Sequence, residues 1–395
     1  MAEGATNPQR LTLIRRTVVI VAAMIVSACS TVVPRTTAPE GPRVVAPPSA
    51  PVVEPGLPND TARHRVALLV PLTGANAGVG RSIANATQLA ILDANNDQLR
   101  ITTYDTATGA AGAAQRAVDE GAQLILGPLL ADDVRAVLPI AKRAGVPVVS
   151  FSNDTSIAGQ GAYLMGYSPA QSIERVVDYA KGQGVTTFGA LVANGVYGQR
   201  ASTAFLRAVE AQGGQVLSLQ TYDRSTASIS GAAARLGKSA PYGAVLIADD
   251  GATAAGVVPL MRRGGVNASA HVLGTERWNA EASVAAKPSL NGAWFASVPD
   301  NLYRQYAVKY RARFGAAPYR LSSMGYDAVL LTIRIARDWP MNARFPEGRL
   351  RDAGGFTGID GVFRFGRDGV AERGLEVQEI RGGTTVTVSP APTGF

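Results

Sequence analysis

Short apolar runs alternate with helical segments along most of this chain, and this alternation constrains the fold more than any other feature. The runs at 65–70, 124–126 and 244–248 are almost continuously apolar, which is typical of strands covered on both faces. Between them, segments such as 79–94 carry apolar residues at helical spacing. The pattern predicts an α/β fold with mostly parallel sheets flanked by helices. Roughly ten such units exceed one sheet's usual size, so we expect two lobes.

The pattern changes towards the end of the chain. Predicted helices at 301–314 and 323–337 are followed by the apolar-rich segments 361–365 and 375–381. The pair Asp368-Gly369 lies between these two segments, and an Asp-Gly pair is a strong turn signal. We therefore expect a terminal hairpin added to the edge of one lobe's sheet.

The first thirty residues have the pattern of an export signal. Three arginines precede an apolar run at 17–26, which is shorter than the ~20 residues needed to span a bilayer. The following letters VSACS resemble the lipobox of bacterial lipoproteins, in which the cysteine thiol carries the lipid. We expect a lipoprotein signal peptide at 1–28 and a lipid anchor on Cys29, the only cysteine. An ordinary signal peptide with an unrelated cysteine is the alternative.

The segment from Cys29 to residue 63 is rich in proline and lacks helical or strand periodicity. Proline fixes its own torsion and removes a hydrogen-bond donor, so we expect an extended tether. No later cysteine exists to form a disulfide, and the 46% hydrophobic content must supply the core. Removing 1–28 lowers the net charge from +8 to +6, and the basic residues are scattered. Nucleic-acid binding is therefore not expected.

The chain is poorly supplied for catalysis. It has only two histidines, His64 and His271, and neither a G-x-S-x-G elbow nor an S-x-x-K nucleophile motif. The loop at 74–82 has glycines in the wrong spacing for a phosphate loop, and an arginine replaces its lysine. The acid pairs at 132–133 and 249–250 are adjacent residues whose side chains point apart. We expect no enzyme activity, no metal and no cofactor.

Ligands of open α/β sheets bind beyond the carboxyl ends of the strands. Those ends are polar, aromatic or glycine-rich here, so two lobes with these edges facing each other would form a ligand cleft. The candidate cleft residues are Thr73, Gly74, Leu129, Ser150, Ser152, Asn153, Tyr197, Asp249, Glu276 and Trp278.

Motifs spread from residue 65 to residue 382 resemble the type I periplasmic binding proteins, in particular the leucine/isoleucine/valine-binding branch. They are VPLTGA at 70–75, TYDT at 103–106, LILGPL at 124–129, GVPVVS at 145–150, VYG at 196–198, GYDA at 325–328 and GVFRF at 361–365. The resemblance implies lobes joined by three crossovers, near residues 165, 296 and 357, that close around a ligand by hinge motion. It assigns 64–165 and 297–356 to the first lobe, and 166–296 and 357–390 to the second.

The resemblance also implies roles for individual residues. Tyr197 matches the aromatic residue that walls the ligand, and Glu276 matches the acid that meets an amino acid's ammonium group. The positions that grip the α-carboxylate fall on Ala131 and near Asp154, and the aromatic of the first loop becomes Val79. Alanine donates nothing and an acid repels a carboxylate, so we expect this half of an amino-acid site to be lost. The alternative is that Tyr197 and Trp278 only cover the lobe surfaces and that Glu276 is a solvated acid in a loop.

A second resemblance accommodates that loss. A lipidated binding-protein fold on a proline-rich tether, with GTERWN at 274–279 and a hairpin at 356–373, looks like the penicillin-binding-protein activator lipoproteins. The resemblance implies a regulator of peptidoglycan synthesis whose partner is a penicillin-binding protein, a cell-wall synthase.

Two alternatives stand beside the regulator. One is a solute-binding lipoprotein of an amino-acid-type ABC transporter, whose partner would be the permease. The other is a sensor of a different small ligand, cationic because Asp154, Asp249 and Glu276 lie near the predicted cleft. All three place the protein in the bacterial cell envelope, lipid-anchored and facing the periplasm. Ser30, where an aspartate would favour inner-membrane retention, indicates the outer membrane.

Overall fold

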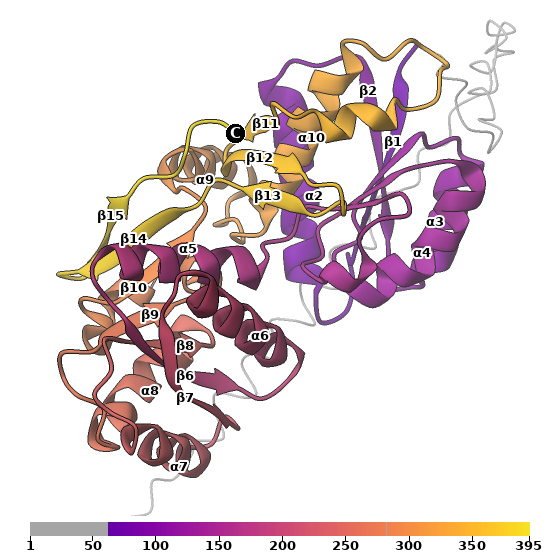
Figure 1. Cartoon of the computed structure of the whole chain (residues 1–395). Coiled ribbons are helices and arrows are strands. Elements are labelled where there is room, and N and C mark those ends of the chain that lie inside the picture. Colours follow the sequence, from indigo (N-terminus) through magenta and orange to yellow (C-terminus); the bar gives the residue numbers. More distant parts are fainter. Residues whose placement is uncertain (1–61, 282) are drawn as a thin grey trace, which may run out of the picture. The chain divides into compact units, whose positions relative to one another are not determined.

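The structure is a computed structural model that describes residues 62–281 and 283–395 and shows an α/β protein in two lobes (Figure 1). The expected signal peptide, the lipid anchor on Cys29 and the tether up to residue 61 lie outside the described residues. Within the described part of the chain, no helix combines the length and hydropathy needed to cross a membrane.

The first lobe is built on a parallel sheet with the strand order β2-β1-β3-β4-β5. Its strands are β1 (His64–Val70), β2 (Leu99–Asp105), β3 (Leu124–Leu126), β4 (Val148–Ser150) and β5 (Ala162–Leu164). Its helices are α2 (Ala77–Asp93), α3 (Ala110–Asp119), α4 (Ala131–Ala144), α9 (Asn301–Phe314) and α10 (Ser322–Ala336).

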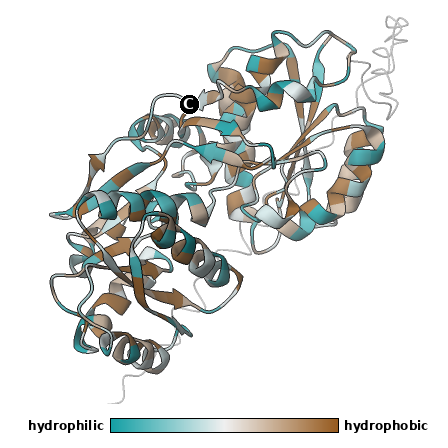
Figure 2. Cartoon of the chain, in the orientation of Figure 1, coloured by the Kyte–Doolittle hydropathy of each residue, from teal (hydrophilic) through white to brown (hydrophobic). Residues whose placement is uncertain are grey.

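Strand β1 shows why this lobe forms. Val66 and Leu68 pack with residues of α2, α9 and α10, whereas Ala67 and Leu69 pack with α3 and α4 on the other face. Successive side chains of a strand point to opposite faces, so a continuously apolar strand needs a cover on both sides. Figure 2 shows the hydrophobic colour along the central strands, and helices with mixed faces around them.

The second lobe has the strand order β15-β14-β10-β9-β8-β6-β7, parallel from β7 to β10. Its strands are β6 (Thr187–Ala193), β7 (Gln215–Tyr222), β8 (Ala244–Ala248), β9 (His271–Gly274), β10 (Trp294–Ser297), β14 (Glu376–Arg381) and β15 (Thr384–Ser389). Its helices are α5 (Pro169–Gly182), α6 (Val196–Ala211), α7 (Thr226–Gly237) and α8 (Gly251–Arg263).

The end of the chain differs from the expected hairpin. Strand β12 (Gly361–Phe365) pairs with β11 (Phe356–Gly358) and, through the Asp368-Gly369 turn, with β13 (Ala371–Arg373). Gly369 has a φ of +82°, which lets the turn close before the chain reaches the predicted partner at 375–381. That segment, β14, instead pairs antiparallel with β10 in the second lobe and continues into β15.

This arrangement moves the last passage between the lobes. The described chain passes from the first lobe to the second after β5, returns after β10, and leaves again between Arg373 and Glu376. Phe356, Phe363 and Phe365 of the small sheet are buried in the same cluster as β1 and α10. Residues 357–373 therefore belong with the first lobe, and the expected third crossover near 357 is corrected to lie just after β13.

Candidate functional site

A cavity of about 700 Å³ lies between the two lobes. Its walls are the segments that follow strands β1, β3 and β4 of the first lobe and β6, β8, β9 and β10 of the second, together with the crossover segments. Apolar side chains dominate the first-lobe side; they are Val79, Leu129, Leu130, Phe151, Leu321 and Met324. The cavity is therefore a cleft at the carboxyl ends of the strands, where open α/β sheets bind ligands.

Tyr197 and Glu276 form the polar part of the second-lobe wall. The Tyr197 hydroxyl lies 2.9 Å from Thr275 Oγ1 and donates to Glu276 Oε1 at 3.0 Å. Burial raises the pKa of the Glu276 carboxyl to about 7, although the Tyr197 hydrogen bond and the charge of Arg277 act in the opposite direction. Glu276 Oε2 is one of the enclosed side-chain atoms of the described chain that have no hydrogen-bond partner.

Asp249 and Trp278 support this wall from behind and do not line the cleft. Asp249 is fully buried and accepts hydrogen bonds from Arg224 and from the Tyr222 hydroxyl at 3.0 Å. The Trp278 indole, also fully buried, donates to the Asp249 carbonyl at 3.2 Å. Gly274 makes this packing possible, since a Cβ there would lie 2.4 Å from the indole ring.

Several candidates from the first lobe are also placed away from the cleft. Thr73 is exposed and donates to Asp105 Oδ2 at 2.7 Å, and Gly74 next to it forms part of a turn with a φ of +72°. Ser150 is buried and donates to the Pro128 carbonyl at 2.8 Å. Ser152 is buried beside it and accepts from the Asp154 amide. Among the sequence candidates, the structure brings together four at the cleft; they are Leu129, Asn153, Tyr197 and Glu276.

The aspartate that was expected to repel a carboxylate is neutralised. Asp154 Oδ1 lies 2.6 Å from Arg200 Nη2, and Asp154 Oδ2 lies 3.1 Å from Arg135 Nη2. Burial acts to raise the pKa of Asp154, but hydrogen bonds from Ser156 and Arg200 hold it at about 2. Asp249 is paired as well. Of the three acids that suggested a cationic ligand, only Glu276 still supports that alternative.

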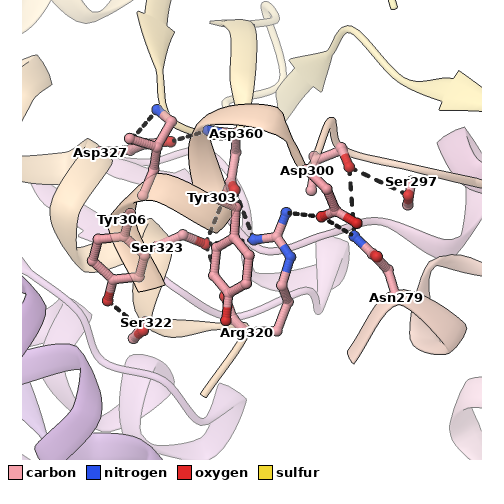
Figure 3. A network of polar contacts seen from close by, with 12 residues as sticks. Asn279, Ser297, Asp300, Tyr303, Tyr306, Arg320, Ser322, Ser323, Asp327 and Asp360 are labelled. Atoms are coloured by element: carbon pink, nitrogen blue, oxygen red, sulfur yellow. Dashed lines mark hydrogen bonds and ion pairs between the residues drawn. The ribbon is translucent and has the colours of Figure 1, made fainter. Parts of the chain in front are cut away.

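A buried network at the crossovers connects the lobes (Figure 3). The Arg320 guanidinium of the first lobe pairs with Asp360 at 2.7 Å and with Asp300 at 3.4 Å, and it lies over the Tyr303 ring. Asp300 also accepts from Asn279 of the second lobe at 3.1 Å. Asp300 is thus held from both sides at the point where the chain returns to the first lobe.

Sequence reasoning missed the arginines of the cleft. Arg200, Arg277, Arg320 and Arg373 all line it. They come from α6, from the segment after β9, from the turn before α10 and from the end of β13, so no local cluster of basic residues brings them together in the sequence. Among the described residues, no group of three or more His, Cys, Asp or Glu side chains is arranged to hold a metal ion.

Comparison with known proteins agrees with the fold. A profile of the periplasmic binding protein family matches residues 64–384. The leucine-binding protein LivK of Thermotoga maritima has a similar structure, with 19% identity, a TM-score of 0.63 and coverage of 83% of this chain and 98% of that one. Full-length LpoA of Haemophilus influenzae has 20% identity and a TM-score of 0.65, with coverage of 83% of this chain and 59% of that one.

A curated relative, the uncharacterized protein RP748 of Rickettsia prowazekii, is 26% identical over 139 residues. That match covers 35% of this chain and spans 37% of the relative's length. The family profile covers far more, from β1 to β15. The chain therefore belongs to the periplasmic binding protein family.

Proposed function

We propose that this chain is a non-enzymatic binding protein of the cell envelope that holds a small ligand in the cleft between its lobes. In this proposal Cys29 carries the lipid anchor, residues up to 63 form the tether, and the protein serves as the solute-binding lipoprotein of an ABC transporter. The family match and the resemblance to LivK support this role.

The observation that carries the proposal is the enclosed and unpartnered Oε2 atom of Glu276, at the wall of a cleft of about 700 Å³. A buried acceptor without a donor costs roughly 1–3 kcal/mol. A ligand that donates an N–H or O–H to this oxygen would remove that cost. Tyr197 positions the carboxylate by binding the other oxygen, Oε1.

A thermal-shift screen of the full chain, purified in detergent, tests this proposal. The panel holds amino acids, organic acids, amines and muropeptide fragments. A ligand at a hundred times its dissociation constant stabilises the protein by ~2.7 kcal/mol, which a melting curve resolves easily. We expect Glu276→Gln to weaken that shift, whereas Glu210→Gln, an exposed change on α6, should leave it intact. Absence of any shift across the panel would overturn the proposal.

The second candidate is the penicillin-binding-protein activator-like regulator. The structural likeness to LpoA, which the chain matches over 59% of that protein, is the observation that favours it. In that role the lipid anchor would sit in the outer membrane and the lobes would contact a cell-wall synthase. Adding the purified chain to a peptidoglycan synthesis assay separates the candidates: a regulator changes the synthase rate without any small ligand, and a solute-binding protein leaves it unchanged.

A further inference from the structure

The loop at residues 337–346 packs directly against the first residue of strand β1. Trp339 of this loop, which follows α10, stacks on His64 with the ring centroids 3.8 Å apart (Figure 1). The indole of Trp339 donates to the Ala343 carbonyl at 3.0 Å, and the Phe345 ring lies edge-on to it, with the centroids 5.0 Å apart. These contacts hold the 337–346 loop at the amino end of the first-lobe sheet, whereas the cleft lies at the carboxyl ends of the strands.

The tip of the 337–346 loop is a turn that presents an apolar side chain to solvent. The Ala343 amide donates to the Pro340 carbonyl at 3.1 Å and closes this turn, in which Asn342 has a φ of +62°. Met341, at the position before Asn342, is 42% exposed. Because the rings of the loop are buried on either side of the turn, the turn is held in place with Met341 in solvent.

Arginines without counter-charges flank this apolar tip. Arg337 and Arg344 are exposed on either side of Met341 in the sequence, and neither has an ion-pair partner among the described residues. The acid of the loop, Asp338, is paired with Arg349 outside it. The 337–346 loop therefore combines two free positive charges with an exposed apolar side chain.

The end of helix α4 adds two more cations at the same place. A Cβ on Gly145, which follows α4, would lie 3.5 Å from Arg344 Nη1, so the loop and the helix end are neighbours. Lys142 and Arg143 in the last turn of α4 are exposed, and no ion pair of the described chain includes either of them. Cations at a helix C-terminus also interact favourably with the helix dipole, so a control must separate that role from binding.

The expected tether joins the protein at this same end. Residue 62 is the first described residue and comes just before β1, whose first residue carries the Trp339 ring. A tether that links Cys29 to this point keeps the amino end of the first lobe close to the anchoring membrane and raises its local concentration there. Each lysine or arginine near an anionic leaflet strengthens binding about fivefold. A surface with four such cations is therefore well suited to that membrane.

We propose that the 337–346 loop and the end of α4 form a docking surface for the anionic phospholipid headgroups of the membrane that holds the lipid anchor. This inference rests on the proposed function, since it needs the anchor on Cys29. The cations meet the phosphate groups, and Met341 enters the boundary between headgroups and acyl chains. A bilayer is favoured over an acidic protein because the tether brings this end of the lobe to a membrane. The cleft, at the opposite end of the sheet, then faces away from that membrane.

Vesicle binding by the full chain tests the docking surface. Cys29→Ser removes the thiol that would carry the lipid, and this protein is added to phosphatidylcholine vesicles with and without phosphatidylglycerol. We expect stronger binding to the anionic vesicles, and weaker binding as salt is added, because salt screens the charges. Arg337→Gln and Arg344→Gln together should lower the affinity for anionic vesicles about 25-fold, at about fivefold for each cation. The apolar run at 17–26 is present in every variant, so its contribution cancels in the comparison.

A matched pair of changes in the second lobe is the control. Lys238 follows α7 as Arg337 follows α10, and Arg263 is the last residue of α8; both control residues are exposed. Lys238→Gln and Arg263→Gln together remove the same charge from helix ends that the tether does not join. This control should bind anionic vesicles as well as the parent protein does. Thermal melts of both double variants should match the parent, since surface changes have small effects on stability.

A fluorescent label locates the contact on the protein. An environment-sensitive dye on Met341→Cys, in the Cys29→Ser background, should shift its emission to shorter wavelength when anionic vesicles are added. The same dye on Lys238→Cys should not respond. Dissolved glycerol phosphate supplies the same phosphate chemistry without a bilayer and should leave both dyes unchanged.

The outcomes separate this inference from the proposed function. Equal vesicle binding by the Arg337/Arg344 variant and its control, or an unchanged dye at Met341, would overturn the docking surface and leave the ligand cleft untouched. A dye that responds equally to glycerol phosphate would overturn the assignment to a bilayer. A wild-type chain whose mass shows no lipid on Cys29 would overturn the anchor of the proposed function, even if the loop bound vesicles.

Discussion

Arg200 of the second lobe, which lines the cleft, forms an ion pair of 2.6 Å with Asp154 of the first lobe. The arginine side chain is 32% exposed and the aspartate 11%, so the pair is partly shielded from solvent. Because the two residues belong to different lobes, their attraction favours the arrangement of the lobes seen in this structure.

Breaking this pair should therefore open the lobes. A partly exposed ion pair contributes up to about 1 kcal/mol, so Arg200→Met should lower the population of the paired arrangement relative to an open one by up to about fivefold. Spin labels at Gln115→Cys and Lys238→Cys in a Cys29→Ser background, measured by electron double resonance, would report the distance between the lobes. Arg207→Met on the same helix is the control. An identical distance distribution in both variants would contradict the prediction.

The Glu276 carboxyl should make stability depend on pH. Its folded-state pKa is raised by burial from 4.5 to about 7, so its contribution is fully present below pH 4.5 and is lost as pH rises through 7. The wild type should lose about 3 kcal/mol of unfolding free energy over that interval relative to Glu276→Gln. Urea titrations at pH 4.5, 6 and 8 measure the difference. Parallel curves for the two proteins would show that the carboxyl titrates normally.

Arg320 should be far more important for stability than a surface arginine. Removing one partner of a buried ion pair costs about 3–5 kcal/mol because the remaining charge is stranded. We expect a loss of this size for Arg320→Met, which leaves Asp360 without its guanidinium. Arg349→Met removes an exposed pair with Asp338 and should cost under about 1 kcal/mol. Denaturant unfolding of both variants checks the prediction, and equal small losses would refute it.

Two glycine-to-alanine changes should have opposite effects. A Cβ at Gly274 would lie 2.4 Å from the Trp278 ring, so Gly274→Ala must displace the indole and the loop that carries Glu276. A Cβ at Gly256 in α8 has open space, and alanine there favours the helix by up to about 1 kcal/mol. Near-ultraviolet circular dichroism and thermal melts should show a perturbed, less stable Gly274→Ala protein. An unperturbed tryptophan signal would show that the loop absorbs the change.

The fold was largely predictable because it depends on the order of apolar and polar residues along the sequence. Strand β1 needs a cover on each face, and its continuous apolar run states that requirement directly. Strand β5, by contrast, has only three residues, which are too few to show the periodic pattern of apolar residues by which a strand is predicted. The third crossover was misplaced because nothing in the apolar pattern distinguishes Gly374, which separates two strands, from the nearby turn glycines.

The site was less predictable because it depends on the direction of side chains and on charge pairing at a distance. Tyr197 and Glu276 were found, since they follow strands whose ends were recognisable. Asp249 also follows a strand, yet it turns away from the cleft towards Arg224. Arg373 comes from the far end of the chain, and only the folded protein brings it to the cleft.

The late arrival of β14 has a consequence for synthesis. Strand β10 acquires its antiparallel neighbour only when residues 376–381 have been made, and until then it is a free edge. A free edge exposes a row of unpaired N–H and C=O groups that other chains can extend. A premature stop after Arg373 would leave a finished first lobe attached to an unfinished second sheet. Such a fragment should be bound by chaperones or degraded, and should not accumulate as a stable half-protein.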